Sequence, residues 1–135
     1  MKRVFVDSNV FLRFFEGDDP EQLERADSLF KAAARAELEL VTGPPVLFEV
    51  AWTLRTSYEL SREETLDVMT TVLALPGLDL IDRSLVDDAV RRAVESGQEF
   101  ADAYIAASIA PSVSESIATF NRRHFEKLGI TIHEF

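Results

Sequence analysis

Short β-like runs alternate along this chain with longer segments of helical periodicity, and this alternation is what most constrains its fold. The β-like runs cover residues 2–6, 38–42, 78–81, 116–120 and 130–134. Between them, apolar residues recur every three or four positions, as on one face of an α-helix. Strands that alternate with helices are typical of α/β folds with a mostly parallel sheet.

The helical segments carry recognisable boundary signals. Pro20 follows two aspartates, which places it in the first turn of a helix. Residues 61–64 (SREE) have the pattern of a capping box. Ser84 is the expected start of another helix, which Gly97 ends.

The composition indicates one globular domain over residues 1–135, because this length is close to the commonest domain size. The chain is 47% apolar and has no cysteine, which excludes a disordered chain and a disulfide scaffold. No apolar stretch approaches the roughly 18 residues of a membrane span, and no signal peptide opens the chain. We therefore expect a cytoplasmic protein.

The charge balance bears on the substrate. Fourteen Lys and Arg residues against twenty-four Asp and Glu residues give a net charge of −10. Such a surface repels nucleic acid on average, because non-specific binding depends on Lys and Arg contacts with phosphates. Either nucleic acid is not the substrate, or a cation lies at the site.

Two expected helices, over residues 44–56 and 100–110, are apolar nearly all round, as helices buried on two sides are. Each carries one carboxylate early in its length, Glu49 and Asp102. An ionised carboxylate in an apolar setting is costly unless it is paired or binds a metal.

Two further polar residues directly follow β-like runs. Asp7 comes after residues 2–6, and Asn121 comes after residues 116–120. Open α/β sheets bind ligands at the carboxyl ends of their strands. Few cations in the sequence lie near enough to pair with every acid, so the pattern favours Mg²⁺ or Mn²⁺, which take oxygen ligands. Such an ion would also supply the positive charge that a phosphate approaches.

Each of these four residues also has a simpler interpretation. Asp7 is a good helix N-cap, and Glu49 fits a solvated polar edge of its helix. Asp102 lies near a helix start, where the helix dipole favours an anion. Asn121 is compatible with an ordinary turn. The four together are much harder to explain as coincidence.

Four segments of this chain resemble the acidic motifs of PIN-domain ribonucleases, and most closely those of the toxin subunit of VapBC-type toxin–antitoxin pairs. The segments are VDSNVFLRFF, FEVAWTL, FADAYIAASIA and ATFNRRHF, in family order and with family-like spacing. The resemblance implies a PIN-like three-layer α/β/α sandwich with a mostly parallel central sheet. It also implies an Mg²⁺- or Mn²⁺-dependent endoribonuclease.

The resemblance assigns roles to the four residues. Asp7, Glu49 and Asp102 match the three acidic metal-site positions, with Asp7 and Asp102 as direct ligands. Glu49 would orient or deprotonate the attacking water, or complete a second metal shell. Asn121 stands where the family usually has a fourth acid. Its amide oxygen can coordinate or hold a water but adds no charge, which leaves the metal affinity open.

Three residues are candidates for substrate binding. Asn9, two residues past the first acid, can reach the same cavity through a water. Arg122 and Arg123, with His124 beside them, form the basic cluster that we interpret as phosphate contacts, the alternative being a solvated turn. Neither His124 nor His133 has metal-ligand spacing, so we expect both to be structural or exposed.

The resemblance further implies RNA as substrate, a cognate antitoxin protein as partner, and a homodimer. Phe14, Phe15, Trp52 and Tyr58 are large residues that can supply a dimer interface, although we expect Trp52 in the core.

Two other function classes compete. A haloacid-dehalogenase-like phosphatase also places an Asp after its first strand, but it needs a second Asp where this chain has Asn9, and its late acidic pair with a catalytic Lys is missing. A PIN-like module that has lost one acid would act through protein contacts alone. Metal-dependent cleavage of mixed RNA, and turnover of p-nitrophenyl phosphate, separate these classes.

Overall fold

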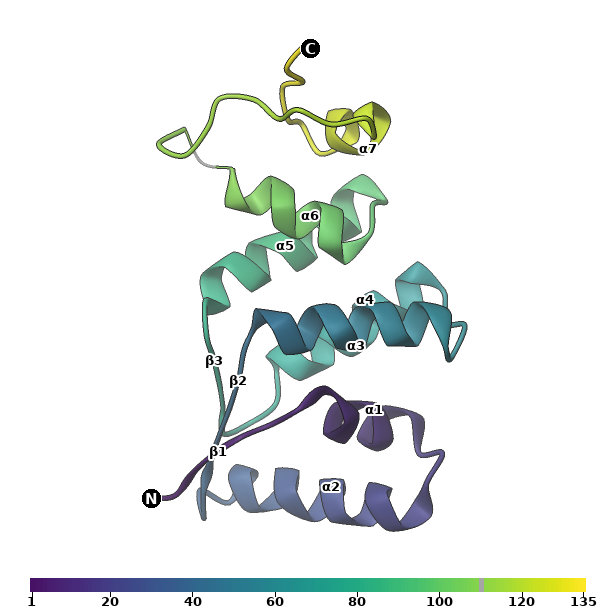
Figure 1. Cartoon of the computed structure of the whole chain (residues 1–135). Helices are drawn as coiled ribbons and strands as arrows, with labels where there is room; N and C mark the ends of the chain where they lie inside the picture. Colours follow the sequence, from purple (N-terminus) through teal and green to yellow (C-terminus); the bar gives the residue numbers. More distant parts are fainter. Residues whose placement is uncertain (110) are drawn as a thin grey trace. The chain divides into compact units, whose positions relative to one another are not determined.

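The computed structural model describes residues 1–109 and 111–135 (Figure 1). The chain forms two compact units, Met1–Asp82 and Arg83–Phe135, and each is described by itself. The prediction of one domain over residues 1–135 stays a prediction.

The first unit is an α/β structure built on a three-stranded parallel sheet. Its elements, in chain order, are β1 (Arg3–Phe5), α1 (Ser8–Glu16), α2 (Pro20–Ala34), β2 (Glu39–Thr42), α3 (Pro44–Thr56), α4 (Arg62–Leu73) and β3 (Leu78–Leu80). The strand order is β1-β2-β3, and both pairs are parallel. The predicted α/β class with a parallel sheet flanked by helices is confirmed, as are the first three predicted strands.

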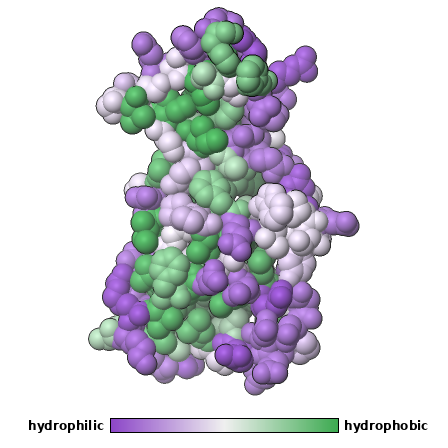
Figure 2. Space-filling view, in the orientation of Figure 1, coloured by the Kyte–Doolittle hydropathy of each residue, from purple (hydrophilic) through white to green (hydrophobic). Residues whose placement is uncertain are grey.

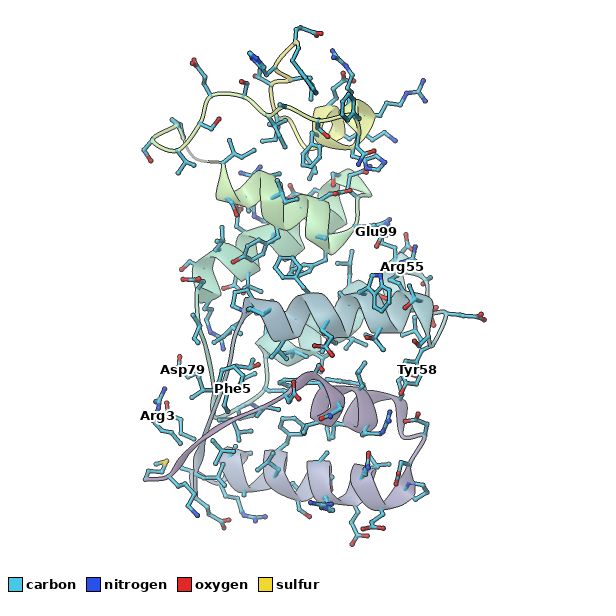
Figure 3. The ribbon with its side chains drawn as sticks, viewed as in Figure 1. Arg3, Phe5, Arg55, Tyr58, Asp79 and Glu99 are labelled. Carbon is cyan, nitrogen blue, oxygen red and sulfur yellow. The ribbon has the colours of Figure 1, made fainter. Side chains whose placement is uncertain are left out.

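The two faces of this sheet differ. Leu40, Thr42 and Leu80 are buried on one face, where the Thr42 hydroxyl donates to the Val6 carbonyl at 3.0 Å. On the other face, the Arg3 guanidinium of β1 pairs with Asp79 of β3 at 3.0 Å (Figure 3). The same guanidinium pairs with Glu39 of β2 at 2.7 Å. These ion pairs link all three strands across a solvent-facing surface and favour the observed register.

Local capping signals define the helices of the first unit. Asp19 is the N-cap of α2, with Pro20 in the first turn, and its carboxylate accepts from the Gln22 backbone N–H at 3.1 Å. Ser61 and Glu64 form the predicted capping box of α4. Helix α1 packs against α2 and α3, and α3 packs against α4. The ring of Phe30 lies 5.6 Å from that of Phe11 within this packing.

The second unit contains α5 (Arg83–Ser96), α6 (Phe100–Ser108) and α7 (Arg122–Lys127). Helix α5 packs along α6, and α6 contacts α7. Helix α5 already begins at Arg83, so the predicted start at Ser84 falls inside the first turn. The predicted helix over residues 100–110 ends at Ser108, and Ala110 lies outside the described residues.

The two last predicted strands, 116–120 and 130–134, are wrong as strands. They form one isolated parallel bridge between Ile117 and Ile132. Its backbone bonds run from the Ile117 N–H to the Thr131 carbonyl and from the His133 N–H to the Ile117 carbonyl. Phe120 is 91% exposed, and no residue of the run 116–120 is fully buried. A β-like pattern forms a strand only where a neighbouring strand pairs with it.

The expectation that the helix over residues 44–56 is buried nearly all round is also wrong. Pro45, Glu49, Trp52 and Thr56 of α3 are exposed, and their spacing of four, three and four residues places them on one face. Trp52, expected in the core, is 68% exposed.

Figure 2 shows apolar and polar groups interspersed on the surface in view. None of the helices in the described ranges has the length and apolarity needed to cross a membrane.

Candidate functional site

Asp7 lies at the carboxyl end of β1. The preceding residue, Val6, is buried, and its N–H still donates to the Val41 carbonyl of β2 at 2.8 Å. Asp7 is then the N-cap of α1, where one carboxylate oxygen accepts from the Ser8 backbone N–H at 2.8 Å. Its side chain is exposed. The capping interpretation is therefore correct, and the same contact holds the carboxylate at the strand end.

Glu49 occupies the exposed face of α3, so its predicted apolar setting is wrong. Its carboxylate makes no hydrogen bond or ion pair with another residue of the described ranges. Asn9 is exposed in the first turn of α1, the helix that packs against α3. Burial does not constrain Glu49, which leaves its carboxylate free for a ligand.

In the second unit, Asp102 contacts His124, which the sequence placed in the basic cluster and predicted to be structural or exposed. Asp102 lies in the first turn of α6, with 22% of its side chain exposed. One of its carboxylate oxygens lies 3.0 Å from Nδ1 of His124 in α7. The two residues are far apart in sequence and belong to two different motif segments, so their contact is tertiary.

Asn121 is the N-cap of the six-residue helix α7, and its side chain makes no capping bond. It follows an irregular segment rather than a strand of the sheet, so the prediction that it stands at a strand end, as Asp7 does, is wrong. Its backbone N–H donates to the Thr119 hydroxyl at 3.0 Å, and its side chain is exposed.

The two predicted phosphate-binding arginines differ. The Arg122 guanidinium donates to both carboxylate oxygens of Glu134, at 3.1 and 2.5 Å. This pairing lowers the pKa of Glu134 and raises that of Arg122. Arg123 is exposed and has no partner among the described residues. Of the two, Arg123 is thus the one free to contact a phosphate.

Neither unit, over the residues described, contains three or more His, Cys, Asp or Glu side chains gathered closely enough to hold a metal ion by themselves. The first unit carries Asp7, Asn9 and Glu49. The second carries Asp102 and Asn121 with the basic cluster. The donors are carboxylate and amide oxygens, the ligand types that Mg²⁺ and Mn²⁺ take.

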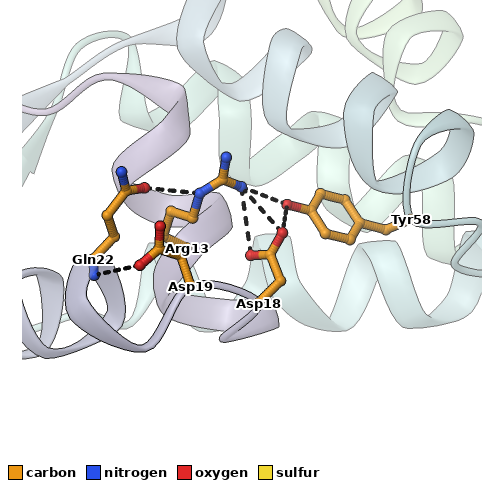
Figure 4. Close-up of polar contacts among 5 residues, drawn as sticks. All are labelled: Arg13, Asp18, Asp19, Gln22 and Tyr58. Carbon is orange, nitrogen blue, oxygen red and sulfur yellow. Dashed lines mark hydrogen bonds and ion pairs between the residues drawn. The ribbon is translucent and has the colours of Figure 1, made fainter.

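A second polar feature of the first unit centres on Arg13 of α1, which sequence reasoning missed (Figure 4). Its Nε donates to Gln22 at 2.9 Å, and its Nη1 donates to the Tyr58 hydroxyl at 2.7 Å. The Tyr58 hydroxyl in turn donates to Asp18 at 2.9 Å. Burial, with the Asp18 contact, raises the pKa of Tyr58. This network fixes the Arg13 guanidinium beside a cavity of about 390 Å³ between α1 and α2.

Comparison with known families identifies the chain. The PIN domain family matches residues 4–130, so the chain belongs to the PIN-domain family. The match spans both units and all four motif positions. PIN domains are generally nucleases, which makes this a nuclease fold of the hydrolase class. No curated protein and no solved structure matches the chain.

Proposed function

We propose that this protein is a divalent-metal-dependent endoribonuclease whose activity depends on Asp7, Glu49, Asp102 and Asn121. The observation that carries the proposal is the PIN-family match over residues 4–130, within which Asp7 follows β1 at its carboxyl end. Family membership supports nucleic acid as the substrate class and phosphodiester hydrolysis as the reaction.

The donor set suits a hard cation, because oxygen atoms remain free on each acid. Asp7 uses one oxygen for the Ser8 N–H, and Asp102 uses one for His124, which leaves the second oxygen of each without a partner in the described ranges. In this proposal Asp7 and Asp102 keep the ligand roles that the motif resemblance implies, each within its own unit, and Asn121 keeps the role of an amide oxygen that can coordinate or hold a water. A bound divalent ion lowers the pKa of a ligated water and stabilises charge on the phosphodiester.

The remaining residues have separate tasks. Glu49, an exposed carboxylate without a partner in the described structure, would orient the attacking water and accept its proton. Arg123 would contact a substrate phosphate, with Arg122 contributing when Glu134 releases it. Asn9 would act through a water. His124 would keep the Asp102 carboxylate oriented through its Nδ1 contact.

The reaction class can be tested with three substrates. Purified protein should cleave a mixed RNA pool in Mg²⁺ or Mn²⁺ and stop when EDTA is added, while leaving p-nitrophenyl phosphate intact. A mixed pool of single-stranded DNA is the control that shows whether cleavage requires the ribose sugar. Phosphate release from p-nitrophenyl phosphate without RNA cleavage would instead favour the phosphatase class, and the absence of RNA cleavage would contradict the proposal.

Asn121 offers a sharper test of the metal site. Asn121→Asp adds an anion where the family usually has an acid, and should lower the Mn²⁺ concentration for half-maximal cleavage about fivefold, on the order of 1 kcal/mol of coupling. Ser112→Asp, an exposed position of the same unit, adds the same charge as a control. An unchanged metal requirement in Asn121→Asp would remove Asn121 from the site.

We further propose that the protein is the toxin of a toxin–antitoxin pair. The resemblance of its four motifs to VapBC-type toxins supports this, and a net charge of −10 suits a partner that inserts Arg or Lys toward the acids. Expression of the chain should arrest growth, and co-expression of the neighbouring reading frame should relieve it. Expression of Asp7→Asn is the control, and growth without arrest on wild-type expression would contradict the toxin role.

A homodimer is part of the same proposal. Trp52, expected in the core, is largely exposed on α3 and is available for an interface. Sedimentation of the wild type and Trp52→Ala should show a dimer that the substitution weakens. A monomeric wild type would contradict this part.

A further inference from the structure

We infer that the cavity between α1 and α2 is a phosphate subsite that holds a neighbouring phosphate of the RNA strand, beside the one that is cleaved. The inference rests on the proposed function and deepens it. The cavity of about 390 Å³ lies wholly within the first unit. Helix α1 contributes Asn9 and Arg13 to its lining, and α2 contributes Gln22 and Arg25.

The lining has the opposite charge character from the chain as a whole. The protein has twenty-four acidic residues and a net charge of −10, yet the cavity lining contains two arginines and two side-chain amides and no carboxylate. Carboxylates repel phosphate, so their exclusion from this surface favours an anion. The three other lining residues are apolar.

Two of the polar groups in the cavity are free to bind. Arg25 is exposed and makes no hydrogen bond or ion pair with any described residue, and the same holds for the Asn9 side chain. Arg25 therefore brings a full positive charge and five N–H donors, the arrangement that grips a phosphate in a bidentate way.

Arg13 has a different part. Its guanidinium is held by Gln22, Tyr58 and Asp18, and the Asp18 carboxylate 3.3 Å away offsets much of its charge. It is thus a positioned donor rather than the main source of attraction. Because Arg13 is already held in place, it loses little conformational entropy when a ligand binds.

The position of the cavity connects it to Asp7. Asn9 follows Asp7 by two residues in the first turn of α1, and Arg13 lies one turn further on the same helix face. A strand with its cleaved phosphate at Asp7 can continue along α1 and place its neighbouring phosphate against Arg25. This continuity favours RNA over an acidic peptide, which two guanidinium groups would also accept.

The test compares Arg25→Gln with Arg35→Gln. Both remove one arginine charge from α2 or its C-cap, but Arg35 pairs with Glu37 and does not line the cavity. A labelled single-stranded RNA is titrated in EDTA, so that binding is measured without cleavage. Arg25→Gln should weaken binding about threefold to tenfold and reduce the salt slope by about 0.7, while Arg35→Gln stays close to wild type.

Cleavage in Mn²⁺ is measured on the same proteins, which separates this inference from the proposed function. A raised KM with unchanged kcat in Arg25→Gln supports the subsite. Equal RNA binding and KM in the two variants would overturn the subsite and leave the nuclease intact. Weakened RNA binding in Arg25→Gln with no cleavage by any protein would keep the subsite and overturn the nuclease.

An acidic peptide is the remaining outcome. Labelled polyglutamate is titrated against the same three proteins. Tighter binding of polyglutamate than of RNA, lost in Arg25→Gln, would show a site for an acidic protein segment and overturn the phosphate assignment.

Discussion

The two units hold their candidate residues by different means. In the first unit, backbone structure fixes Asp7, because a hydrogen-bonded strand ends beside it and α1 begins with its carboxylate as cap. In the second unit, side-chain pairs do this work: His124 contacts Asp102, and Glu134 holds Arg122. Asn121 caps α7 without a side-chain bond.

This difference has an energetic consequence. A cap at the end of a paired strand depends on many cooperative backbone bonds, whereas an exposed ion pair contributes little and weakens with salt. Substitutions of comparable size should therefore cost more in the first unit than in the second.

Two glycines give the largest expected contrast. Gly77 and Gly129 both have φ of +77°, a conformation that disfavours side chains. A Cβ on Gly77 would lie 2.5 Å from the Ala33 carbonyl oxygen, whereas a Cβ on Gly129 meets nothing within 4 Å. We expect Gly77→Ala to lower the free energy of unfolding by about 3 kcal/mol and Gly129→Ala by about 1 kcal/mol. Denaturant unfolding followed by circular dichroism measures both, and equal losses would contradict the contrast.

The next largest effect on the free energy of unfolding is expected in the hydrogen-bond network of Arg13. Tyr58→Phe removes a hydroxyl that accepts from Arg13 and donates to Asp18. We expect the free energy of unfolding to fall by about 1.5 kcal/mol. Glu134→Gln, which breaks the exposed pair with Arg122 in the second unit, is the comparison and should leave thermal unfolding unchanged. A larger loss of stability in Glu134→Gln than in Tyr58→Phe would contradict the expectation that substitutions cost more in the first unit than in the second.

The smallest effect concerns Glu16, whose pKa is raised by burial and by the carboxylates of Asp18 and Glu64. The folded state thus favours the protonated form of Glu16. The stability of the folded state therefore falls as the pH rises through the raised pKa, because the carboxylate form is disfavoured there. Glu16→Gln should therefore stabilise the protein at pH 7, by less than about 0.5 kcal/mol since the side chain is largely solvated.

The pH dependence of the stabilisation by Glu16→Gln tests whether the raised pKa of Glu16 is its cause. The gain from Glu16→Gln should vanish below about pH 4, where Glu16 is protonated in both states. Glu24→Gln, an exposed position on α2, is the control for charge removal alone. A gain that persists at low pH would assign the effect to packing instead.

Sequence reasoning succeeded where structure is local. The Ser61–Glu64 capping box and the start of α2 at Pro20 depend on neighbouring residues, so their patterns predicted them correctly. Asp7 at a strand end follows from the run 2–6 in the same way.

Sequence reasoning failed where contacts with residues distant in the sequence determine the structure. The run 116–120 has strand composition but no strand ladder to join, and the exposure of Trp52 depends on which helices cover α3. The contact between Asp102 and His124 is tertiary and leaves no periodic trace. Conversely, no motif marked Arg25, since an unpaired arginine becomes notable only when the cavity around it is known.

The proposed cleavage reaction depends on Asp7 in the first unit and on Asp102 in the second, and one comparison of rates tests this dependence. Asp7→Asn and Asp102→Asn each remove a carboxylate charge while changing few atoms, and Asn is as good an N-cap as Asp at position 7. In saturating Mn²⁺, with folding checked by circular dichroism, each variant should cleave RNA more than about a hundredfold more slowly than wild type. Wild-type cleavage by either folded variant would contradict the claim.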